Sequence, residues 1–93
     1  MKYLKTYENI KIQKPTNGDY VIVEYDDLEE FFQKQIGILK YSYYDDNDLI
    51  CVSQFVDTNG EPILIESFLS DIKYWTKNKK DAEIYLTSKK YNL

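Results

Sequence analysis

The chain of 93 residues contains neither histidine nor arginine. Histidine is the commonest general base near neutral pH and the commonest transition-metal ligand, so its absence removes the usual means of proton transfer and metal binding. Arginine provides a planar fork for two hydrogen bonds to phosphate or carboxylate, and that fork is missing too. An enzyme would have to work with Asp, Glu, Lys, Tyr or Ser alone. We therefore expect a protein that is not an enzyme and that has no cofactor.

Cysteine is almost absent as well. Cys51 is the only one, so no disulfide can form within the chain. It lies inside the apolar run LICV, and a catalytic thiol would need a nearby base, usually histidine. We interpret Cys51 as a small buried core residue.

Long hydrophobic runs are also missing. No apolar stretch approaches the roughly 20 residues of a membrane-spanning helix, and the N-terminus MKYLKTYENI is too polar for a secretion signal. Hydrophobic residues make up 43% of the chain and charged residues 30%, which is typical of a globular protein. We expect one domain over residues 1–93, in the cytoplasm, with no membrane partner.

The stretch from residue 18 to residue 65 predicts four successive β-strands. Runs rich in Val, Ile, Leu, Phe and Tyr alternate there with gaps rich in Asp, Asn and Gly. Asn59-Gly60 suits a hairpin turn, and Gly37 indicates a bulge or a close backbone approach inside a strand. The four predicted strands span residues 19–25, 35–44, 49–57 and 61–66.

The segments around these strands are shorter or more polar. The acidic connection 26–34 contains Leu28, Phe31 and Phe32, so it should fold back as a hydrophobically anchored loop or a single helical turn. After the fourth strand we predict a 3₁₀-like turn, a fifth strand and a helix capped by Asn78 or Thr76. These three elements span residues 67–71, 72–75 and 78–91. In the N-terminal arm, residues 1–17, we expect a short edge strand near residues 10–13 and then a turn.

The order of these segments resembles that of the Src-homology-3-like barrels, which include KOW and Tudor modules. The order is GDYVIV, long loop, IGILKY, turn, LICVSQFV, tight turn, PILI, helical turn and short strand. The resemblance implies a mainly β fold, a small five-stranded antiparallel barrel over residues 18–75, with a C-terminal α-helix over 76–93. The start MKYLKTYEN is similar to those of uncharacterised bacteriophage proteins. Lys used without Arg, and a single Ala, also follow AT-rich codons, so we expect a phage-encoded protein.

Charge is unevenly distributed along the chain. Residues 19–66 contain twelve acids and two lysines, a net charge of −10, whereas residues 1–18 and 67–93 carry +3 each. Ten tyrosines stand against four phenylalanines, so tyrosine is the dominant aromatic residue. Sign asymmetry of this kind bears on partners rather than on fold.

The acids and tyrosines define the candidate binding site. The resemblance implies that the loop after the first strand and the turn after the second flank one groove. Acids beside aromatics in one groove suit a basic protein surface, although both segments could also be ordinary solvated loops. The candidate residues are Tyr25, Asp26, Asp27, Glu29, Glu30, Tyr43, Tyr44, Asp45, Asp46 and Asp48.

These observations favour a non-enzymatic protein-binding module, phage-encoded, that inhibits a host defence complex by occupying a basic, nucleic-acid-binding surface. One alternative is a protein that sequesters a small nucleotide through tyrosine stacking and the lysines Lys73, Lys77, Lys79 and Lys80. Another is a KOW-like nucleic-acid-associated module, which the acidic middle disfavours. Asp45, Asp46 and Asp48 lack the EF-hand spacing, so we predict no metal site. Trp75 should pack the helix on the barrel.

Overall fold

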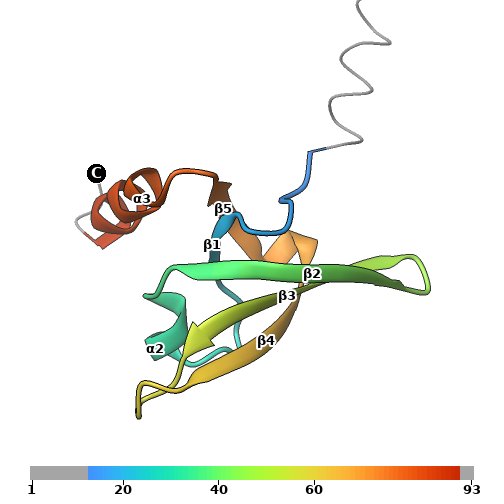
Figure 1. Ribbon diagram of the computed structural model, residues 1–93, viewed down its shortest axis with the longest axis horizontal. Helices are drawn as coiled ribbons and strands as arrows, with labels where there is room; N and C mark the ends of the chain where they lie inside the picture. Colours follow the sequence, from blue (N-terminus) through green and yellow to red (C-terminus); the bar gives the residue numbers. More distant parts are fainter. Residues whose placement is uncertain (1–12, 91–93) are drawn as a thin grey trace, which may run out of the picture.

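The computed structural model describes residues 13–90, which form one five-stranded antiparallel sheet and a C-terminal helix (Figure 1). The strands lie in the order β4-β3-β2-β1-β5. The predicted edge strand near residues 10–13 falls almost wholly outside the described residues. The elements are β1 (Tyr20–Val23), α2 (Glu30–Gln33), β2 (Gly37–Asp45), β3 (Asp48–Val56), β4 (Pro62–Phe68), η1 (Leu69–Asp71), β5 (Ile72–Thr76) and α3 (Lys79–Lys90).

The five predicted strands and the C-terminal helix are confirmed, and each strand boundary lies within two residues of its prediction. The prediction of a closed barrel is wrong in one respect. Over residues 13–90 no ladder joins β4 to β5, so hydrogen bonds do not close the sheet. At the end of β4 a side chain takes the place of a neighbouring strand: the backbone N–H of Phe68 donates to the Asp71 carboxylate at 3.0 Å.

The core lies where β1 and β5 face β3 across the curved sheet. Val21, Val23, Cys51 and Phe55 are all buried there. The long connection after β1 contributes Leu28 and Phe32, which are 7% and 8% exposed. The hydrophobically anchored connection is therefore confirmed, and α2 is its single helical turn. Burial raises the pKa of the Cys51 thiol, which stays protonated in this environment.

At Gly37, the first residue of β2, the backbone lies directly against the buried ring of Phe55. A Cβ atom at this position would lie 2.5 Å from Cζ of Phe55, so no side chain fits between the strand and the ring. The predicted close backbone approach is confirmed. Beyond this point β2 and β3 continue as a long hairpin, which extends to the right in Figure 1 and ends at Asp45 and Asp48.

The helix α3 packs at the opposite end of the molecule from the tip of that hairpin (Figure 1). Its start is capped as predicted, since Oδ1 of Asn78 accepts the N–H of Lys80 at 2.9 Å. Ala82 is completely buried, and Tyr85 stacks on Tyr74 of β5 with ring centroids 4.6 Å apart. Trp75 packs against the core cluster, and the stacked contact with the helix belongs to its neighbour Tyr74.

Candidate functional site

An acidic hollow of about 460 Å³ lies beside the C-terminal half of β4. Its charged lining residues are all acids. Ile50 and Ser67, which are 9% and 6% exposed, form its buried part, while Phe68 is 51% exposed at its side. The residues that line this acidic hollow are Tyr25, Asp26, Asp27, Ile50, Glu66, Ser67, Phe68 and Asp71.

The loop that carries Tyr25, Asp26 and Asp27 is held in place by its own backbone. The N–H of Glu24 donates to the carbonyl of Asp71 at 2.9 Å, which ties the end of β1 to η1. The N–H of Leu28 donates to the carbonyl of Tyr25 at 3.0 Å and closes a turn around the two aspartates. The Gln33 amide donates to the carbonyls of Tyr25 and Leu28 at 3.2 and 2.6 Å, so α2 braces the loop from behind.

Two tyrosine hydroxyls connect the hollow to Glu66. Oη of Tyr43, on β2, donates to Oε2 of Glu66 at 2.9 Å. Oη of Tyr25 donates to the Glu66 backbone carbonyl at 3.5 Å, which is a long hydrogen bond. Glu66 is thus held by two tyrosines, Tyr43 of the long hairpin through its side chain and Tyr25 of the loop through its backbone.

The electrostatics of the hollow are set by its carboxylates. Burial raises the pKa of Tyr25, and the negative charges of Asp71 and Asp27 raise it further. The hydrogen bond to Glu66 is the largest cause of the raised pKa of Tyr43. Both phenols therefore stay neutral and act as hydrogen-bond donors. The negative charges that raise their pKa values would attract a cationic group to the hollow.

Ser67 is the unusual polar group of the hollow. Its hydroxyl oxygen is buried and has no hydrogen-bond partner among residues 13–90. Buried hydroxyls are normally paired, because leaving one unpaired costs about 1–3 kcal/mol. Ser67 is therefore a lining residue of the hollow with a buried, unpaired hydroxyl.

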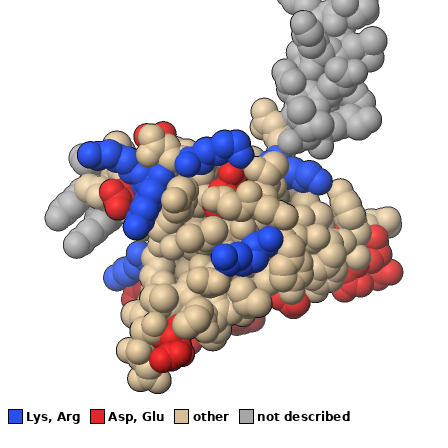
Figure 2. All heavy atoms as spheres, in the orientation of Figure 1, with Lys and Arg blue, Asp and Glu red and all other residues tan. Residues whose placement is uncertain are grey.

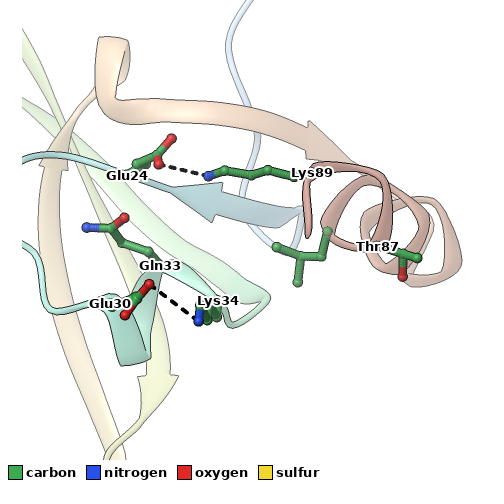
Figure 3. Close-up of a pocket in the computed structure, with 7 residues that line it drawn as sticks. Glu24, Glu30, Gln33, Lys34, Thr87 and Lys89 are labelled. Atoms are coloured by element: carbon green, nitrogen blue, oxygen red, sulfur yellow. Dashed lines mark ion pairs between the residues drawn. The ribbon is translucent and has the colours of Figure 1, made fainter. Parts of the chain in front are cut away.

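The predicted acidic segment after β1 is divided between two places. Asp26 and Asp27 line the acidic hollow, whereas Glu30 faces a different pocket of about 500 Å³ between α2 and α3. Figure 3 shows that pocket and its two ion pairs, Glu24 with Lys89 at 2.9 Å and Glu30 with Lys34 at 3.4 Å. Its carboxylates are thus already paired with lysines.

Glu29 precedes α2 and its side chain is exposed, and it lines neither of these pockets. Its backbone carbonyl accepts the N–H groups of Phe32 and Gln33 at 2.9 and 3.2 Å. Its role in the described structure is therefore to begin the helical turn rather than to line the site.

The predicted acidic turn after β2 also lies apart from the acidic hollow. Tyr44 and Asp48 line a separate, open depression that also contains Lys14. Asp45 and Asp46 form the exposed tip of the hairpin, where Asp46 has a positive φ of 58°. Acidic side chains gather at this right-hand tip in Figure 2. The ten candidate residues therefore do not line one groove, and Tyr25, Asp26, Asp27 and Tyr43 are the four that meet around Glu66.

Glu66, Ser67, Phe68 and Asp71 belong to the hollow but were not among the predicted site residues. The sequence carries one signal for them. The strand PILIESF ends with an acid, a hydroxyl and an exposed aromatic residue just before the turn. Aromatic residues are enriched at protein interfaces, so the exposed Phe68 makes this end of the strand a candidate contact surface.

Two of the four lysines considered above for nucleotide binding already make hydrogen bonds within the protein. Nζ of Lys77 donates to Oδ1 of Asp19 and to Oγ1 of Thr16, both at 2.8 Å. Nζ of Lys73 donates to the carbonyl of Ser70 at 3.2 Å. Lys79 and Lys80 stand exposed in the first turn of α3. The four lysines therefore do not form a free cationic cluster.

Within residues 13–90, no group of three or more His, Cys, Asp or Glu side chains is arranged to hold a metal ion. In that same part of the chain, no helix has the length and apolar character needed to span a membrane. Comparison with protein-family models, with curated proteins and with solved structures gave no match to this chain.

Proposed function

We propose that the protein is a non-enzymatic binding module of Src-homology-3-like architecture whose acidic hollow receives a basic segment of a protein partner. The strand order β4-β3-β2-β1-β5, the long connection after β1 and the 3₁₀ turn before β5 support this architecture. The observation that carries the function is the hollow itself, in which all charged lining residues are acidic and aromatic rings stand beside them.

The chemistry of the hollow fits a lysine or arginine side chain. Asp26 and Asp27 are exposed and can make charge-assisted hydrogen bonds to a cation. The rings of Tyr25 and Phe68 can contact the aliphatic part of such a side chain, or its charge through a cation–π interaction. The partner class that we propose is a host enzyme or complex with a basic, nucleic-acid-binding surface, blocked by a phage-encoded inhibitor.

A binding experiment with a matched charge control tests this proposal. A short lysine-rich peptide, fluorescently labelled, is titrated with the wild-type protein and with two double variants. Asp26→Asn/Asp27→Asn removes two charges from the hollow, and Asp45→Asn/Asp46→Asn removes two from the distant hairpin tip. We expect the first to weaken binding about tenfold or more, because charge-assisted contacts are lost, and the second to have a small effect.

Equal loss in the two variants would mean that only net charge attracts the peptide. No loss in either variant would exclude the hollow as the site of a basic partner. In both cases the proposed function would be wrong, and circular dichroism of each variant would exclude unfolding as the cause.

A further inference from the structure

Strand β4 lies at an edge of the sheet over residues 13–90. It pairs with β3 without a register shift, from Val56 opposite Pro62 to Ile50 opposite Phe68. One side of its backbone is therefore bonded to β3, and the other side faces away from the sheet. The backbone groups on that open side decide what can pair with the strand.

The ladder shows which residues face the open side. The N–H of Asp57 donates to the carbonyl of Glu61 at 2.8 Å, so these two residues form a hydrogen-bonded pair. Hydrogen-bonded and non-bonded pairs alternate along an antiparallel ladder. The backbone groups of Ile63, Ile65 and Ser67 therefore point to β3. Those of Pro62, Leu64, Glu66 and Phe68 point to the open side.

Two contacts agree with this assignment and mark where the open edge ends. The Phe68 N–H is taken by the Asp71 carboxylate, and the Glu66 carbonyl accepts the Tyr25 hydroxyl. Pro62 has no N–H to offer. The groups that remain directed to the open side are the carbonyl of Pro62, both groups of Leu64 and the N–H of Glu66.

This edge is only partly protected against pairing with another strand. Edge strands are normally protected by charged side chains, lysine above all, by a bulge or by proline. Between Pro62 and Phe68 the register is unbroken, the only proline begins the strand, and the one charged side chain is the acid Glu66. Ile63 and Leu64 are 36% and 53% exposed, so apolar side chains accompany the free backbone groups.

We propose that the partner's basic segment binds as an extended strand along Pro62–Glu66, where it adds a sixth strand to the sheet, with a lysine side chain entering the acidic hollow. This inference rests on the proposed function and specifies its geometry. Glu66 belongs both to the open edge and to the hollow, so a strand paired with Leu64 leads directly into it. Alternation along such a strand favours a peptide in which apolar residues and lysines alternate.

Charge specifies the occupant. The charged residues of β4, of the residue before it and of the hollow are Glu61, Glu66, Asp26, Asp27 and Asp71, and all of them are acidic. Ser67, whose buried hydroxyl has no partner among residues 13–90, also lines the hollow. An acidic strand would be repelled by these carboxylates, and a neutral strand would leave them without a cationic partner.

The test uses a short peptide of alternating valine and lysine and measures its affinity by isothermal titration calorimetry. Leu64→Pro removes the N–H on the open side and keeps the bonds to β3, since proline is tolerated on the open side of an edge strand. Leu64→Ala is the matched control, because it removes the same side chain and keeps the N–H. We expect Leu64→Pro to weaken binding about three- to tenfold relative to Leu64→Ala, as the loss of one hydrogen bond implies.

A second measurement uses only the wild-type protein, so it does not depend on whether a variant folds. The same peptide, N-methylated at every residue, has no backbone N–H on either edge and cannot pair as a strand, so we expect it to bind wild-type protein much more weakly. Hydrogen exchange followed by NMR should show new protection of the Leu64 and Glu66 amides when the unmodified peptide is bound. A valine–glutamate peptide should not bind.

The outcomes separate this inference from the proposed function. If Leu64→Pro and the N-methylated peptide bind as well as their controls while Asp26→Asn/Asp27→Asn binds weakly, the hollow is the site and strand pairing is wrong. If the valine–glutamate peptide binds equally well, the basic chemistry is wrong. Sedimentation tests whether the edge pairs with a second copy of the chain instead. If it shows a dimer that persists when the peptide is added and that is lost in the Leu64→Pro variant, the inference is overturned.

Discussion

Gly37 lies against the ring of Phe55 so closely that a Cβ atom would come within 2.5 Å of Cζ. The ring has little room to move, because Phe55 is 2% exposed and packs edge-on against Phe32 at 6.1 Å. The glycine is needed here for space and not for a positive φ. By contrast, Gly60 has a φ of 81° and open space around it.

We expect Gly37→Ala to lower the free energy of unfolding by about 1–3 kcal/mol, as overpacking does in other cores. Urea denaturation measures this change. Phe55→Leu in the same chain should relieve part of the clash, so the double variant should lose less stability than the sum of the two single variants. Additive losses would show that the clash is not the cause.

Asp19 is the one carboxylate of the described structure that is both buried and paired. It is 4% exposed, accepts the N–H of Thr16 at 2.8 Å and bonds Nζ of Lys77 at 2.8 Å. Burial alone would raise its pKa, but the hydrogen bonds from Lys77 and Thr16 outweigh burial, and its pKa lies below the ordinary value. The unfolded chain therefore binds a proton at this residue more readily than the folded protein does.

A folded-state pKa below the unfolded value contributes stability above the unfolded pKa of about 3.9, and that contribution is lost as the pH falls through the folded value. We expect Asp19→Asn to lower the free energy of unfolding at neutral pH by about 1–3 kcal/mol. The difference from wild type should shrink as the pH is lowered below about 4. Asp46→Asn, at the exposed hairpin tip, is the control and should have little effect at any pH. Urea denaturation at several pH values measures both.

At the scale of elements, the docking of α3 depends on a few contacts. Ala82 is completely buried against the sheet, Tyr85 stacks on Tyr74, and Lys89 bonds Glu24 at 2.9 Å. The ion pair is 38% exposed on both sides, so solvent weakens it, and the apolar contacts matter more. The small side chain of Ala82 sets the distance between helix and sheet.

We expect Ala82→Leu to lower the free energy of unfolding by about 1–3 kcal/mol, because the added atoms have no space at this contact. Ile84→Ala is the matched control on the same helix, since Ile84 is 57% exposed, and its change should stay within about 0.5 kcal/mol. Thermal unfolding followed by circular dichroism and by the fluorescence of Trp75 measures both. A stable Ala82→Leu variant would mean that α3 can shift without cost.

At the scale of the whole molecule, charge is unevenly distributed. In Figure 2, most lysines lie over α3 and along the upper part of the molecule, where a few acids accompany them, and further acids gather at the hairpin tip. The acidic hollow and the edge of β4 add a second acidic region, from which lysine is absent in the lining. The proposed basic partner should therefore be steered toward the side of the sheet that carries β4 rather than toward α3.

We expect the affinity for the valine–lysine peptide to fall several-fold as NaCl is raised from about 0.05 to about 0.5 M, because exposed charges are screened over a shorter distance. The Asp26→Asn/Asp27→Asn variant should show a shallower dependence on salt than the Asp45→Asn/Asp46→Asn control. Titrations at several salt concentrations measure the two slopes. Equal slopes would place the attraction outside the hollow.

The sequence by itself determined where the strands, turns and helix lie, because apolar alternation, Asn59-Gly60 and the cap at Asn78 are local signals. It also indicated an acidic, tyrosine-rich candidate site, and three of the residues that it named, Tyr25, Asp26 and Asp27, line the acidic hollow. Only the tertiary structure decided which of these residues meet. Tyr25 and Glu66 are 41 positions apart, and strand pairing and the turn at η1 bring them together while the hairpin carries Asp45 and Asp46 away. Hydrogen bonding along β4 likewise depends on which side of the strand β3 occupies, and no local pattern encodes that.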